Sequence, residues 1–179
     1  EEVISARFPD ARVARLDRDT AQGKGLRTIL AAVRKREVDI LVGTQMVTKG
    51  HDFPDVTLVG VICADLGLHF PDFRAGERTF QLLTQVAGRA GRGDRPGRVL
   101  VQTYSPQHAS LRCAREHDYE AFFNQEVLCR EERGYPPTGH LTSVHLSGPK
   151  PDEVARIARD LASEARRLST DDVCILGPA

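Results

Sequence analysis

The sequence predicts an α/β fold, a parallel sheet with helices on both faces, followed by part of a small α+β domain. Three observations predict this class. Short apolar segments alternate with amphipathic helical segments through residue 104. Those apolar segments are nearly continuous, which is typical of strands buried on both faces of a parallel sheet. Two consecutive prolines, Pro136 and Pro137, then end a helical region and a new strand–helix–strand pattern begins.

Each element of the first part follows from its own pattern. Strands are predicted where apolar and β-branched residues run together, at 13–17, 39–44, 56–64 and 97–104. Helices are predicted at 24–37 and 74–88, where apolar residues recur every three or four positions, as Phe80, Leu83 and Val86 do. Two more helices are predicted before Pro136. They include Phe122 and Phe123, which we expect to pack on the core.

The second part is shorter. Apolar residues on one face predict a helix at 151–168, and alternation predicts strands at 140–147 and 173–176. We place the domain boundary near residue 134, giving domains at 1–133 and 134–179. A strand, a helix and one more strand do not make a complete domain, so we expect the chain to be a piece of a longer protein.

Composition excludes some classes of function. Twenty-five basic residues balance 25 acidic ones, and 40% of the residues are hydrophobic, as in ordinary soluble domains. No apolar run approaches the ~20 residues of a membrane span, so no membrane contact is expected. The four cysteines form no C-x-x-C pair. We therefore expect reduced thiols, with Cys63 in the core, and no metal site within this chain.

The stretch "QVAGRAGR" at 85–92 is the strongest local signal for a binding site. Gly88 and the glycine at 91 would each cost about 1 kcal/mol on a helix surface relative to alanine, which indicates that another surface approaches closely. Arg89 and Arg92 are permanent cations whose planar donor groups suit phosphate. The alternative is a basic helix end whose arginines face its own terminal carbonyl groups and solvent.

A second signal is "GTQMVTKGHDFPDV" at 43–56, directly after a predicted strand. Ligands of parallel sheets bind beyond the carboxyl ends of the strands. Thr44 and Gln45 offer neutral hydrogen-bonding groups for sugar and phosphate oxygens, and Lys49 adds a charge. Gly50 permits close contacts, and Asp52 can accept hydrogen bonds from a ribose hydroxyl. The alternative is a tight strand-to-helix loop with a capped helix.

Taken together, these stretches resemble a family. "TQMVTKGHDFP", followed about thirty residues later by "QVAGRAGR", resembles the fifth and sixth motifs of superfamily-two helicases. The segments "LHFPDFRAGERTFQLLTQVAGRAGR", "VQTYSPQH" and "GYPP" are similar, in the same order, to the replication-restart helicases of that superfamily. The resemblance covers nearly the whole chain.

The resemblance implies a RecA-like fold for residues 1–133, as the second of two motor lobes with ATP and Mg²⁺ in the cleft between them. The parent protein would be an ATP-dependent 3′-to-5′ DNA helicase that recognises stalled or branched forks and restarts replication by primosome assembly. The first lobe would carry the phosphate-binding loop G-x-x-x-x-G-K-[ST], which does not occur in these 179 residues, so the chain alone should not hydrolyse ATP. Zinc would be bound in the parent by cysteines absent here.

The resemblance also implies partners and residue roles. The partners would be single-stranded and branched DNA, single-strand-binding protein, and primosome or helicase-loading proteins, in the bacterial cytoplasm at the nucleoid. Three residues would act at the ATP, with Arg92 as the finger to the γ-phosphate: Gln85, Arg89 and Arg92. Three would face the nucleotide: Gly50, Asp52 and Gly88. Three would contact DNA: Thr44, Gln45 and Lys49.

Two alternative functions remain open. The first is a fork-binding module that recruits partners without hydrolysing ATP. The second is a different superfamily-two helicase that shares only the fifth and sixth motifs. The "GYPP" segment and the domain after it argue against the second alternative, because a generic helicase lobe needs neither.

Overall fold

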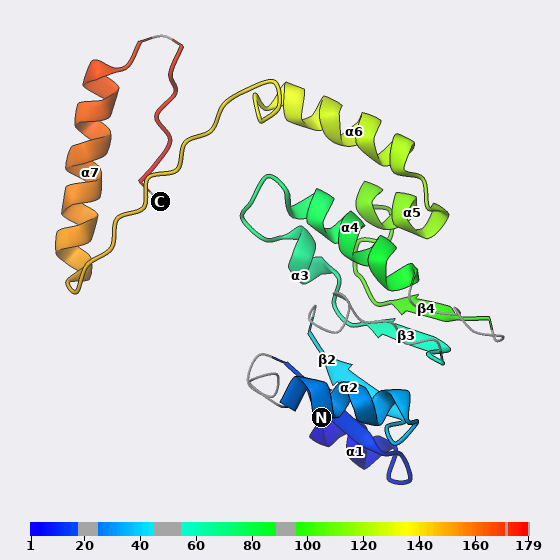
Figure 1. Ribbon diagram of the computed structural model, residues 1–179. Helices are drawn as coiled ribbons and strands as arrows, with labels where there is room; N and C mark the ends of the chain where they lie inside the picture. The colour runs from blue at the N-terminus through cyan, green and yellow to red at the C-terminus, as the bar shows by residue number, and fades with distance from the viewer. Residues whose placement is uncertain (18–24, 45–54, 89–95, 171, 179) are drawn as a thin grey trace. The chain divides into compact units, whose positions relative to one another are not determined.

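A computed structural model of the chain describes residues 1–17, 25–44, 55–88, 96–170 and 172–178 (Figure 1). The chain divides into two compact units, residues 1–138 and 139–179, and each is described by itself. The assignment of helicase lobe and following domain to 1–133 and 134–179 remains a prediction.

The first parallel strand pair joins β1 (Val13–Leu16) to β2 (Ile40–Gly43), with Val13 opposite Ile40. Before β1 lies α1 (Glu2–Arg7), and α2 (Gly25–Arg34) lies between the strands in sequence. Leu16 at the end of β1 is fully buried. The sequence pattern therefore predicted these strands correctly to within about one residue at each end.

An ion pair holds the amino ends of β1 and β2 together. The Nε and Nη2 atoms of Arg12 each donate to the Asp39 carboxylate over 2.8 Å, and Nη2 also donates to the Arg36 carbonyl oxygen over 2.7 Å. The backbone N–H of Arg12 donates to the same carboxylate. The hydrogen bonds from the Arg12 side chain, and then from its backbone, hold the pKa of Asp39 well below its usual range.

The second parallel strand pair joins β3 (Leu58–Val61) to β4 (Arg98–Val101), with Leu58 opposite Arg98. Two helices separate these strands in sequence, α3 (Asp65–Leu68) and α4 (Ala75–Ala87). The strands are joined to each other through backbone ladders, whereas α4 packs onto the two helices that follow β4.

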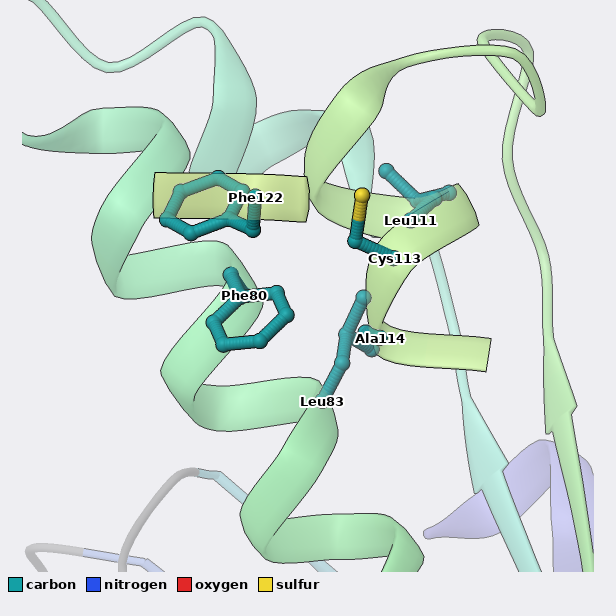
Figure 2. Close-up of a cluster of buried hydrophobic side chains, with 6 residues drawn as sticks. All are labelled: Phe80, Leu83, Leu111, Cys113, Ala114 and Phe122. Atoms are coloured by element: carbon teal, nitrogen blue, oxygen red, sulfur yellow. The ribbon is translucent and has the colours of Figure 1, made fainter. Parts of the chain in front are cut away.

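The main core lies between α4, α5 (Ala109–Glu116) and α6 (Tyr119–Glu132), and Figure 2 shows its side chains. Every third or fourth residue of α4 is buried, as the helical period predicted. Val61 of β3 and Leu68 of α3 pack against the same cluster. The cluster consists of Phe80, Leu83, Leu111, Cys113, Ala114 and Phe122.

Two expectations about the core were wrong. Phe122 is buried, but its neighbour Phe123 is 50% exposed, because adjacent residues on a helix point about 100° apart and only one of them can face α4. Cys63 is half-buried, because it follows β3 in a left-handed conformation (φ 55°) and not within the ladder. The buried thiol of the core is that of Cys113.

The predicted single sheet differs from what the structure describes. Within the described ranges, the strands form two separate two-stranded parallel sheets, β1–β2 and β3–β4. Residues 45–54, which lead from β2 to β3, lie outside the described residues. The α/β class with small parallel sheets and helices is confirmed, and the RecA-like arrangement remains a prediction.

The second unit contains α7 (Pro151–Leu168), which matches the predicted helix at both ends. Proline at its first position fits because the missing N–H has no partner within a helix there. The predicted strands at 140–147 and 173–176 were wrong, since the described residues of this unit form no strand. Alternation favours an extended backbone, but a strand also needs a neighbour to complete its hydrogen bonds.

Candidate nucleotide and nucleic-acid site

Helix α4 positions the described part of the "QVAGRAGR" stretch. Its buried face includes Phe80, Leu83 and Val86, and Val86 is only 3% exposed. Gln85 and Gly88, at the carboxyl end of the helix, are exposed. Burial of one face therefore fixes the opposite face outward, and that face carries two of the predicted site residues.

The local structure does not itself require glycine at position 88. Its backbone is right-handed (φ −71°, ψ −1°), and its N–H donates to the Thr84 carbonyl oxygen over 3.1 Å. An added Cβ would lie 3.6 Å from the Thr84 carbonyl oxygen and 3.7 Å from that of Gln85, which is ordinary contact. The described residues therefore leave room for a side chain at position 88, and the role of Gly88 at a nucleotide stays a prediction.

The other end of α4 is anchored by polar contacts. The hydroxyl of the fully buried Ser110 donates to the Gly76 carbonyl oxygen over 2.8 Å. Glu77, in the first turn of α4, pairs with Arg130 of α6 over 2.7 Å. The start of α4 is thus held by contacts with α5 and α6.

Thr44 lies directly after β2 and is exposed, at the carboxyl end of a parallel strand as predicted. It comes from a different element than Gln85 and Gly88. The remaining predicted site residues lie outside the described residues, and their roles stay predictions: Gln45, Lys49, Gly50, Asp52, Arg89 and Arg92.

Sequence reasoning missed Asp65, which is 6% exposed and joins the carboxyl ends of β3 and β4. Its carboxylate accepts a hydrogen bond from the Tyr104 backbone N–H over 3.0 Å and another from the Thr103 hydroxyl over 3.1 Å. Burial raises the pKa of Asp65, but hydrogen bonds from Tyr104, Thr103, its own backbone N–H and Ser105 together lower it by more, so the net shift is downward. The available signal was an acid directly after a long apolar run.

Sequence reasoning also missed Arg130, whose side chain is 13% exposed. Its partners are Glu77 of α4 and Glu126 of α6, and its guanidinium lies over the Phe73 ring, 5.2 Å from the centroid. The pairing with Glu126 has the i,i+4 spacing that a sequence can reveal. Glu77 and Arg130 are 53 positions apart in the sequence, so no local pattern indicates that they pair.

The described ranges contain no group of three or more histidine, cysteine, aspartate or glutamate residues that could hold a metal ion. None of the helices that the structure describes is long and apolar enough to cross a membrane.

Comparison with known proteins identifies the class. The family described as the helicase conserved C-terminal domain matches residues 1–94, and the chain belongs to that family. In particular, the chain is similar to proteins named replication restart protein PriA. It is 47% identical to that of Bacillus subtilis over 180 residues, which is 100% of this chain and 22% of the relative.

Two further relatives bear the same name. The chain is 45% identical to the PriA protein of Synechocystis over 99% of this chain, and 42% identical to the PriA protein of Treponema pallidum over 100% of this chain. These alignments cover 22% and 27% of the relatives. The chain therefore spans about a quarter of the length of the curated relatives it matches.

Proposed function

We propose that this chain is the second motor lobe, with the start of the following domain, of an ATP-dependent 3′-to-5′ DNA helicase. The helicase acts at stalled or branched replication forks and restarts replication through primosome assembly. The observation that carries the proposal is the similarity to replication restart proteins, which extends over the whole chain. Membership of the helicase C-terminal family supports the same reading.

At the nucleotide, Gln85, Arg89 and Arg92 line one wall of an ATP site. The first lobe supplies the opposite wall with its phosphate-binding loop and the Mg²⁺ that accompanies ATP. Arg92 reaches the γ-phosphate and stabilises charge that develops in the transition state. Gly50, Asp52 and Gly88 face the nucleotide. The outward direction of Gln85 and Gly88 on α4, and the space at Gly88, support this arrangement.

At the nucleic acid, Thr44, Gln45 and Lys49 contact the backbone of single-stranded DNA. The exposure of Thr44 at the carboxyl end of β2 supports this role, because parallel sheets bind ligands at that edge. The parent protein carries zinc on cysteines outside this chain. It works in the bacterial cytoplasm at the nucleoid, with single-strand-binding protein and primosome or helicase-loading proteins.

The 179 residues alone hydrolyse no ATP, because the phosphate-binding loop is not among them. The test therefore uses the longer parent protein. DNA-stimulated ATP hydrolysis is compared for wild type, Arg92→Ala and Arg98→Ala. Arg98 is a matched control, an exposed arginine from the same basic stretch that begins β4.

We expect Arg92→Ala to lose at least about 10³-fold in the rate of hydrolysis while still binding forks. Arg98→Ala should stay close to wild type. Equal hydrolysis by wild type and Arg92→Ala would refute the role of Arg92. A wild type that binds forks without hydrolysing ATP would instead establish a recruiting module.

A further inference from the structure

Arg130 joins separate segments of the first unit through a nearly buried guanidinium. Its Nη2 atom donates to Glu77 of α4 over 2.7 Å, and its Nε atom donates to Glu126 of α6 over 2.9 Å. Its cation lies over the Phe73 ring, which precedes α4. Tyr135, just after α6, contacts the same ring with centroids 5.8 Å apart. One side chain thus ties α4 to the carboxyl end of α6.

Packing of α4 against α6 does not by itself require this charge. Phe80 and Phe122 already join the two helices through stacked rings one turn away from Glu77 (Figure 2). A buried ion pair seldom stabilises a fold more than apolar side chains of the same volume. Hydrogen bonds of a planar guanidinium differ from apolar contacts because they are directional. Burial of Phe80, Leu83 and Val86 sets which face of α4 turns inward. The directional hydrogen bonds of Arg130 to Glu77 and Glu126 then refine that rotation more than they add stability.

The two carboxylates contribute differently. Glu126 lies one turn before Arg130 on the same helix and orients the arginine side chain, and its Oε2 also lies near Gly76 of α4, 3.4 Å from where a Cβ on that glycine would stand. Glu77 is the partner that crosses between helices. Burial lowers the pKa of Arg130, but the hydrogen bonds and charges of Glu77 and Glu126 raise it more, so the cation persists at any physiological pH.

Because α4 is one continuous helix, a change in its rotation at Glu77 also changes the direction of Gln85 and Gly88 at its carboxyl end. Gly88 lies about 16 Å farther along the axis and only about 20° around it from Glu77, given helical geometry. In a rigid helix, the direction of the Glu77 side chain therefore determines the direction in which Gly88 faces. Misplacement of a reacting group by about 1 Å can cost about 10²-fold in rate.

We propose that Arg130 is a positioning residue for ATP hydrolysis: by holding Glu77 it refines the rotation of α4, and so the direction in which Gln85 and Gly88 face the nucleotide. This inference rests on the proposed function. Arg130 does not touch the nucleotide, and its effect passes through α4.

The test compares Glu77→Ala with Glu126→Ala in the longer parent protein. Both remove one carboxylate from Arg130, but only Glu77→Ala breaks the hydrogen bond that joins Arg130 of α6 to α4. The readouts are kcat and KM for ATP with saturating single-stranded DNA, at a temperature well below the thermal midpoint of each variant. We expect Glu77→Ala to lower kcat about tenfold or more with KM nearly unchanged, and Glu126→Ala to lower kcat much less.

Arg130 itself supplies the second comparison. We expect Arg130→Met to lose kcat as Glu77→Ala does, and Arg130→Lys to recover part of it, because lysine keeps the charge but not the planar pair of donors. If Arg130→Met does not fold, the two glutamate variants decide the question.

The outcomes separate the inference from the proposed function. An active wild type with equal kcat in Glu77→Ala and Glu126→Ala overturns the positioning role and leaves the proposed function intact. The same holds if kcat falls only in proportion to the unfolded fraction. A wild type without ATP hydrolysis overturns the proposed function and this inference together.

Discussion

Phe80 of α4 stacks on Phe122 of α6, with ring centroids 4.3 Å apart and ring planes only 2° from parallel. The two side chains are 5% and 3% exposed. They form an apolar contact between these helices in the described core, and they lie one turn along α4 from the Glu77–Arg130 pair. The apolar and ionic contacts between α4 and α6 can therefore be tested separately.

Removing the apolar contact should destabilise the first unit strongly. Phe122→Ala is expected to lower the free energy of unfolding by about 3–5 kcal/mol, because a buried aromatic ring is lost and a cavity remains. Phe123→Ala is the matched control, since that neighbour is 50% exposed, and should cost less than about 1 kcal/mol. Urea unfolding measures both. Similar losses for the two variants would contradict the described core.

Gly88→Ala tests whether glycine at this position is required for stability or for ATP hydrolysis. Because the backbone is right-handed and a Cβ meets only ordinary contacts, this substitution should leave stability unchanged or raise it by up to about 1 kcal/mol. Gly134→Ala is the contrasting control, since Gly134 has φ +63° and an L-residue is strained there. Thermal unfolding measures both effects.

A second readout on Gly88→Ala tests the proposed ATP site. If glycine serves close approach to the nucleotide, ATP hydrolysis by the longer parent protein should fall although the protein remains folded. Full activity in a stable Gly88→Ala variant would show that nothing approaches this helix end closely. A marked loss of stability would show that the fold needs glycine after all.

The amino end of α5 should make stability depend on pH. His108 caps this helix by accepting the Ser110 backbone N–H at Nδ1 over 3.2 Å, which requires that nitrogen to be unprotonated. Burial is the main cause that lowers the pKa of His108, and His69 lowers it further, while Glu126 opposes the shift. The unfolded state, with an ordinary pKa of about 6.5, then binds the proton more readily than the folded state.

The sign follows from this difference. The contribution of His108 is fully present above about pH 6.5 and is lost as the pH falls from there through the lower folded pKa. His108→Asn keeps a capping side chain that does not titrate. We expect wild type to lose more stability than His108→Asn between about pH 7.5 and 5.5. Parallel losses in the two proteins would show that His108 does not titrate in this way.

Asp65 should be more important to stability than either of its partners. Asp65→Ala leaves both the Tyr104 N–H and the Thr103 hydroxyl without their charged acceptor, whereas Thr103→Val removes one donor to Asp65 and the neutral acceptor of the Ser105 N–H. We therefore expect Asp65→Ala to lower the urea midpoint clearly more than Thr103→Val does. Equal midpoints would mean that water replaces the carboxylate at no cost.

Local patterns in the sequence predicted the helices well. The apolar face of 151–168 gave both ends of α7, and the period of Phe80, Leu83 and Val86 gave the buried face of α4. The predictions of strands at 140–147 and 173–176 were wrong, because a strand needs a neighbouring strand to hydrogen-bond with, and alternation of apolar residues does not show whether one is present. The prediction for Phe123 was wrong because it points about 100° away from Phe122, whose ring takes the position against α4.

The candidate site was predictable only in part, for the same reason. Motif spacing led to Gln85, Gly88 and Thr44, which the structure finds exposed at the ends of a helix and a strand. Asp65 and Arg130 escaped prediction because their hydrogen bonds reach partners 38 and 53 positions away in the sequence. Such contacts follow from tertiary packing, which no periodicity encodes.

The cysteines of this chain differ in exposure, so their rates of reaction with a thiol reagent can report opening of the core. Cys113 is 2% exposed at the centre of the helical core, whereas Cys129 and Cys174 are exposed. A thiol reagent therefore modifies the exposed Cys129 and Cys174 first and the half-buried Cys63 more slowly, and it reaches Cys113 only when α4, α5 and α6 separate. The delay before Cys113 is labelled reports how often this core opens in the native protein, without any substitution or attached dye.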